Sequence, residues 1–158
     1  MNQEYFSVTL SSNINLAVPL ENMGTVIQIE TKNICMIPGV ANFWHGTVNF
    51  KGSLLWVLDS DSYFNLNNKQ KRHQKKLTAI IIKPHQSENL AKIALITSKL
   101  QGIISVASEN LTQLPNDSKS PLQQCCSTMI EQETKRTFIL NPTSLLEQLH
   151  QQSAFVPG

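Results

Sequence analysis

The sequence predicts a mainly β domain with short helices and one helix near its C-terminal end. Phe6, Val8 and Leu10 alternate with polar residues, as the side chains of a half-buried strand do. Gly46 and Gly52 bracket a second alternating run, which predicts a short strand followed by a hairpin bend. Further short runs of this kind are separated by polar, turn-forming segments, a spacing that is typical of all-β domains.

The segment after the first strand predicts a turn, a second strand and then helical structure. Residues 11–15 are polar, and Leu16 and Val18 resume the strand pattern. Pro19 suits the first turn of a helix. The apolar residues that then recur at helical spacing are Leu20, Met23, Val26 and Ile27. We therefore expect a short helix or helical turn as far as residue 27.

Residues 53–58 form a nearly continuous β-favouring run, which predicts a strand that is buried on both faces or lies at a barrel corner. Asp59 follows this run at the position of a helix N-cap, so we expect a short helix over 60–64. A first β unit closes at about this point.

The C-terminal part predicts a hairpin followed by a helix. Residues 129–130 and 137–140 are the apolar parts of the two strands. Asn141 and Pro142 then cap a helix with a single apolar stripe. The stripe consists of Leu145, Leu146 and Leu149. We expect it to pack on the β structure, with a partner's groove as the alternative.

A second β unit begins at residue 77, with expected strands over 79–82 and 93–96. When residues 16–27 are placed over residues 93–104, the apolar positions coincide. The matching positions are 16, 18, 23, 26 and 27 with 93, 95, 100, 103 and 104. This pattern favours one β plan used twice, although strand–turn–strand patterns also match by chance.

Composition indicates a cytoplasmic globular protein with a weakly charged surface. Of 158 residues, 41% are hydrophobic and 15% charged, and the net charge is +2, so no strong overall field attracts nucleic acid. No apolar run is long enough to span a bilayer, and no signal peptide is recognisable at the start. Cys35 stands alone, and the neighbours Cys125 and Cys126 are poorly placed to bridge each other.

Residues 67–76 contain no apolar side chain and hold five of the thirteen basic residues: Lys69, Lys71, Arg72, Lys75 and Lys76. A solvated hairpin tip or linker is the main interpretation of this segment. The alternative function for the chain is a nucleic-acid-binding β-barrel module that uses residues 69–76, although the segment lacks interleaved aromatic residues. Contact with an acidic partner surface is a further alternative.

The titratable residues form no recognisable catalytic or metal-binding pattern. Asp59 and Asp61 fit a helix cap and a solvated neighbour better than a carboxylate pair. The four histidines are scattered, and the glycines match no phosphate-binding loop. We therefore expect no enzyme activity, no metal and no cofactor. A protein of this kind works through its surfaces, by binding other proteins.

The segment IPGVANFWHGTVNFKGSLLWVLD resembles the CheW-like domain, whose motif is a Pro, a spacer and then G-V-x-N-L-R-G-x-x-x-P-V-x-D. The matching residues are Pro38, Gly46, Val48, Asn49, Phe50, Lys51, Gly52, Val57 and Asp59. The segments INLAVPLENMGTVI, KIALITSKLQGIISV and TFILNPTSLLEQL are similar to other parts of the family pattern. They extend the resemblance over nearly the whole chain.

The resemblance implies a single domain over residues 1–158, made of two small five-stranded β-barrels side by side with short helices and a C-terminal helix. The first barrel would cover about 15–66 and the second about 77–140. Members of this family are non-catalytic adaptors without cofactors. They couple the regulatory domain of a CheA-type histidine kinase to the signalling tip of a methyl-accepting receptor. No nucleic acid and no membrane insertion is implied.

The sequence departs from the family pattern at several positions. Lys51 replaces the motif's Arg and loses its bidentate hydrogen-bonding geometry. Trp56 replaces a Pro. A Trp at this position resembles cyanobacterial CheW-like proteins of the PilI and PixI kind, which serve type IV pilus motility and phototaxis. Thr25 and Ser98 replace acidic residues, and Asn141 replaces an Asp while keeping its capping ability.

The resemblance assigns five residues to partner binding. Met23, Thr25 and Val26 would lie on the helical turn, and Gly46 and Lys51 come from the motif. Met23 and Val26 also have the spacing of core residues, and Gly46 also suits a backbone bend. Lys51 is the strongest candidate, because an exposed cation at the end of a strand has no packing role.

Overall fold

The computed structural model describes residues 2–66, 74–85, 90–114, 120–132 and 134–152. The strands in this part of the chain are β1 (Asn2–Thr9), β2 (Asn15–Pro19), β3 (Met23–Glu30), β4 (Trp44–Phe50), β5 (Ser53–Leu58), β6 (Lys76–Ile82), β7 (Ile93–Thr97), β8 (Lys99–Ala107), β9 (Leu111–Gln113), β10 (Cys126–Gln132) and β11 (Lys135–Leu140). The helices are α1 (Ser60–Tyr63), α2 (Pro121–Gln124) and α3 (Pro142–Gln152), with 3-10 turns η1 (Ser11–Asn13), η2 (Leu20–Asn22), η3 (Thr31–Asn33) and η5 (Ser108–Asn110). The mainly β prediction is confirmed.

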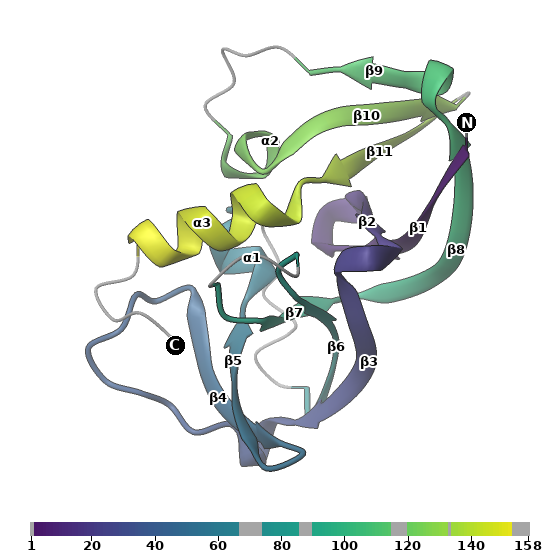
Figure 1. The fold of residues 1–158 in the computed structure, drawn as a ribbon. Helices are drawn as coiled ribbons and strands as arrows, with labels where there is room; N and C mark the ends of the chain where they lie inside the picture. The colour runs from purple at the N-terminus through teal and green to yellow at the C-terminus, as the bar shows by residue number, and fades with distance from the viewer. Residues whose placement is uncertain (1, 67–73, 86–89, 115–119, 133, 153–158) are drawn as a thin grey trace.

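Two sheets lie on either side of α3 (Figure 1). Sheet A has the strand order β8-β1-β2-β11-β10-β9, and sheet B has the order β3-β6-β7-β5-β4. The pairs β2–β11 and β5–β7 are parallel, and the remaining pairs are antiparallel. Both sheets take strands from both halves of the chain, so the ranges 15–66 and 77–140 each contribute to sheet A and to sheet B.

The chain crosses between the two sheets at two equivalent places. β2 lies in sheet A and is followed by β3 in sheet B, whereas β7 lies in sheet B and is followed by β8 in sheet A. Both incoming strands are bulged at corresponding places, after Met23 in β3 and between Leu100 and Gly102 in β8. The repeat hypothesis, with 16–27 equivalent to 93–104, is therefore confirmed.

The equivalence continues into the hairpins β4–β5 and β10–β11, which share one register and a bulge near the start. Each hairpin ends in a helix cap. Asp59 accepts hydrogen bonds from N–H groups of the first turn of α1, and Asn141 accepts one from Ser144 N–H in α3. The N–H of Asp59 donates to Phe43 O at 2.9 Å, and that of Asn141 to Cys125 O at 2.7 Å. Both predicted caps are confirmed.

The main hydrophobic core lies between the sheets. Leu145, Leu146 and Leu149 of α3 are buried there. Side chains from both sheets share the same cluster, among them Val8, Leu16, Leu58, Ile80, Ile82 and Leu95. The prediction that the α3 stripe packs on the β structure is thus confirmed. Smaller clusters fill the other face of each sheet.

The expected helical structure up to residue 27 is wrong beyond its first turn. Only Leu20–Asn22 is helical, and Met23–Glu30 is a strand paired with β6. The bulge between Met23 and Val26 inserts one extra residue, so that both side chains pack against the main core at a spacing that imitates a helix. β-branched residues at 25, 26, 27 and 29 favour the strand.

Two glycines shape the β4–β5 hairpin in different ways. Gly52 has φ +80 and follows Lys51 with φ +51, and this pair forms the two-residue turn that the sequence predicts. Gly46 lies at the bulge of β4 with φ +144. A Cβ on Gly46 would collide with the carbonyl oxygen of Cys35, whereas nothing lies within 4 Å of a Cβ on Gly52.

We expect Gly46→Ala to lower the free energy of unfolding by about 3 kcal/mol or more, because it combines a strained φ with a backbone collision. The matched control, Gly52→Ala, should cost only about 1 kcal/mol, from the positive φ alone. Urea denaturation followed by circular dichroism measures both changes. Equal losses for the two variants would contradict this account of Gly46.

Candidate functional site

Three of the predicted partner-binding residues lie together on β3, an outer strand of sheet B. Met23 and Val26 are half-buried and pack against the main core. Thr25 is exposed, and its hydroxyl lies 3.3 Å from the carbonyl oxygen of Val26. The three side chains therefore belong to an edge strand and not to the expected helical turn.

The other two predicted residues lie elsewhere in sheet B. Lys51 is exposed at the β4–β5 turn, with its ammonium group 5.3 Å from the centre of the Phe50 ring. At an exposed site such a cation–π contact contributes roughly 0.5–1 kcal/mol. Gly46 is buried at the bulge, where it shapes the backbone path, and its part in partner binding stays a prediction.

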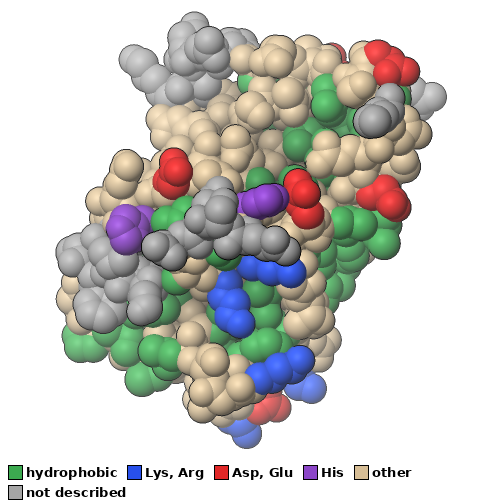
Figure 2. Space-filling view, in the orientation of Figure 1, with side chains coloured by type: hydrophobic (Ala, Val, Ile, Leu, Met, Phe, Trp, Pro, Cys, Tyr) green, Lys and Arg blue, Asp and Glu red, His purple; other side chains and the backbone are tan. Residues whose placement is uncertain are grey.

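Two apolar residues on β8 join the candidate surface, although the sequence did not assign them to it. Leu100 and Ile103 are 42% and 61% exposed on the outer strand of sheet A. They pair with Val8 and Phe6, which belong to the main core or pack against it. Hydrophobic side chains reach the surface on the right of Figure 2, where β8 runs in Figure 1.

The repeat relates this β8 pair to the β3 pair. Leu100 occupies the position of Met23, and Ile103 that of Val26. Both pairs lie on the first strand after a crossing between the sheets. Met23 and Val26 pack against the main core, and Leu100 and Ile103 pair with Val8 and Phe6, which belong to that core or pack against it. The apolar match between 16–27 and 93–104 already related Leu100 and Ile103 to Met23 and Val26. Spacing alone, however, cannot tell an outer strand from a central one.

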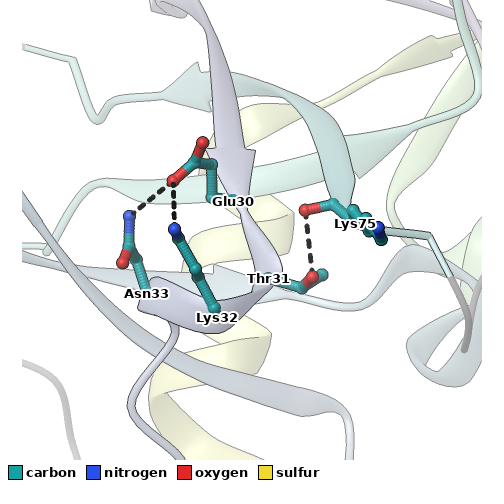
Figure 3. A network of polar contacts seen from close by, with 5 residues as sticks. All are labelled: Glu30, Thr31, Lys32, Asn33 and Lys75. Atoms are coloured by element: carbon teal, nitrogen blue, oxygen red, sulfur yellow. Dashed lines mark hydrogen bonds and ion pairs between the residues drawn. The ribbon is translucent and has the colours of Figure 1, made fainter.

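A groove of about 310 Å³ opens between β3 and β4, the two outer strands of sheet B. It is lined by Ile27, Gln28, Ile29, Glu30, Asn33, Val48, Asn49 and Phe50. A polar network stands at its β3 end (Figure 3). The carboxylate of Glu30 lies 3.8 Å from Lys32 Nζ and accepts a hydrogen bond from Asn33 Nδ2, while the hydroxyl of Thr31 donates to Lys75 O.

The buried titratable groups are unsuited to nucleophilic chemistry. Burial raises the pKa of the Cys125 thiol to about 12 and raises the pKa values of Cys126 and Tyr63. The Sγ of Cys125 and the hydroxyl of Tyr63 both donate to Gln148 Oε1 at 3.3 Å. These groups thus brace α1, α2 and α3 against one another as neutral hydrogen-bond donors.

The structure describes only part of the basic segment and shows no metal site or membrane-spanning helix among the described residues. Of the basic residues in 69–76, Lys69, Lys71 and Arg72 lie outside the described residues, and Lys75 and Lys76 are exposed at the start of β6. Within the described ranges, no three His, Cys, Asp or Glu residues are grouped so as to hold a metal ion. None of the described helices is both long and apolar enough to cross a membrane.

We expect a thiol reagent at pH 8 to modify only Cys35 in the native protein, and all three cysteines after denaturation. Cys35 is exposed, whereas Cys125 and Cys126 are buried, and none of the three is in a disulfide.

Folding raises the pKa of Cys125 from 9.0 to about 12, so the contribution of the Cys125 thiol to stability is present below pH 9 and is lost as the pH rises towards 12.

The thiol measurement uses Cys35→Ser as its control, because this variant should show no fast reaction in the native state. A fast reaction that persists in Cys35→Ser would contradict the burial of the other two thiols.

Comparison with known proteins places these features in a family. The family model described as CheW-like domain matches residues 4–150. Among solved structures, the scaffolding protein TtCheW from Thermoanaerobacter tengcongensis is similar in fold, with a TM-score of 0.73 and 16% sequence identity over 89% of each chain. No curated protein matches the sequence. The match of the family model to residues 4–150, nearly the whole length, shows that the chain belongs to the CheW-like domain family.

Proposed function

We propose that this chain is a non-catalytic adaptor that couples a CheA-type histidine kinase to the signalling tip of a methyl-accepting receptor. Membership of the CheW-like family supports this role. The observation that carries the proposal is the exposure of Leu100 and Ile103 on β8, at positions equivalent to Met23 and Val26 on β3. Apolar side chains on exposed strand edges are typical of protein-binding surfaces.

The receptor side of the adaptor is assigned to these two edges. Its residues are Met23, Thr25 and Val26 of β3 together with Leu100 and Ile103 of β8. Met23 and Val26 pack against the core cluster that the two sheets share, and Leu100 and Ile103 lie on a strand that pairs with β1, so both pairs are held by paired strands. A receptor helix recognised here would place its hydrophobic stripe against these side chains. Thr25 would provide a polar contact without the charge that the family's acidic residue supplies.

The proposed kinase partner is supported by family membership alone, and the proposed pathway by family resemblance at Trp56. The kinase regulatory domain is itself a domain of the CheW-like kind, and the role places the adaptor in the cytoplasm. Phototaxis or type IV pilus motility is favoured over flagellar chemotaxis by Trp56. This residue is 6% exposed and stacks edge-to-face on Trp44 at 5.3 Å, so its direct role is packing.

We expect Ile103→Glu to weaken binding of a receptor signalling-tip fragment by about tenfold or more, because the contact would bury an unpaired charge. Leu54→Glu is the matched control, since Leu54 is 67% exposed in β5, away from both apolar edge pairs. Calorimetry measures the affinity, which should be micromolar for the unchanged protein. Binding of the kinase regulatory domain should survive Ile103→Glu.

Two outcomes would overturn parts of this proposal. If neither the receptor fragment nor the kinase regulatory domain binds, the adaptor role is wrong. If Ile103→Glu binds the receptor fragment as well as Leu54→Glu does, the assigned surface is wrong. The nucleic-acid alternative requires retention on single-stranded DNA that falls steeply with salt.

A further inference from the structure

We propose that the groove between β3 and β4 is a separate docking site for an extended peptide segment of a partner protein, with alternating apolar and acidic side chains. The segment would add to the outer edge of β3 by main-chain hydrogen bonds. This site uses the second half of β3, Ile27–Glu30, and not the residues assigned to the receptor.

The strand edges around the groove decide where a peptide can pair. In the described part of sheet B, β3 pairs with β6 on one side and with no strand on the other. β4 already uses its outer edge at Thr47, whose N–H and carbonyl are both bonded to Cys35, at 2.9 and 2.8 Å. The regular, open edge of β3 along Ile27–Glu30 is a template for strand addition, so β3 is the pairing edge.

The floor of the groove is apolar. Ile27 and Phe50 line it, and both are half-buried against the inner core cluster of sheet B. Ile29 and Val48 lie below them and are 5% and 7% exposed. Alternate side chains of an added strand point to the same side. Every second residue of the peptide would therefore contact this floor, which selects apolar residues at those positions.

A positively charged side chain stands beside the groove. Lys51 is exposed beside Phe50, and no described carboxylate forms an ion pair with it. The one acidic residue lining the groove, Glu30, is compensated by Lys32 and Asn33 (Figure 3). Figure 2 shows several Lys or Arg side chains and fewer acidic ones on the lower half of the view, over sheet B. The remaining peptide positions should therefore be acidic.

The chemistry of this groove fits an acidic peptide better than the other available occupants. A single-stranded nucleic acid needs exposed aromatic platforms, and Phe50 is half-buried. A second copy of this chain would offer an outer strand, but β4, β8 and β9 contain no acidic residue and β3 contains only Glu30. The end of the groove that follows β3 is held in place, because Thr31 donates hydrogen bonds to Lys75 O from its N–H at 2.9 Å and from its hydroxyl at 3.0 Å.

The test uses a fluorescent peptide of about eight residues that alternates valine and aspartate. Its binding to the full chain is followed by anisotropy. Lys51→Glu should weaken binding about fivefold, as expected for loss of an exposed ion pair. Asn33→Trp should weaken it by about tenfold or more, because the exposed Asn33 side chain lines the groove and an indole would fill it. Lys92→Glu is the matched charge control and should bind normally, since Lys92 is exposed outside the groove.

A second peptide, with lysine in place of aspartate, tests the charge requirement and should bind at least about fivefold more weakly. Normal receptor-fragment binding by Asn33→Trp shows that this variant is folded. The proposal is overturned if the aspartate peptide does not bind, if the lysine peptide binds equally well, or if Asn33→Trp binds as the unchanged protein does.

Discussion

Three leucines of α3 enter the space between the two sheets and share one buried cluster with strands of both. Each buried leucine contributes roughly 2 kcal/mol of hydrophobic free energy. This packing fixes how the sheets lie relative to each other and therefore where the outer strands β3 and β8 stand. The relative position of the candidate binding surfaces on β3 and β8 therefore depends on this shared core.

Exposed strand edges are a hazard for a β protein, because they invite unwanted pairing. Here the two edges carry half-exposed aliphatic residues and bulges, and the bulges interrupt regular pairing. We interpret this combination as an edge used for side-chain recognition at its bulged first half. The regular second half of β3, next to the groove, keeps an edge suited to main-chain recognition.

Local signals allowed much of the fold to be predicted. The Asp59 and Asn141 caps, the turn at Gly52 and the α3 stripe each depend on a few neighbouring residues. The strand nature of Met23–Glu30 was missed, because a bulge gave it helical spacing. The exposure of Ile103 was missed because it follows from strand order, which depends on pairing with distant β1. A crossing of the chain between sheets leaves no local mark in the sequence.

The way in which both halves of the chain contribute to both sheets also bears on how the molecule assembles. Sheet A includes β1 and β2 from the N-terminal half, and sheet B includes β6 and β7 from the C-terminal half, so neither half holds a full set of strands without the other. Folding and unfolding should then be a single cooperative event, limited by closure of long loops. A chain cut between α1 and β6 would yield two fragments that become structured only by reassociating, as complementary pieces of one molecule.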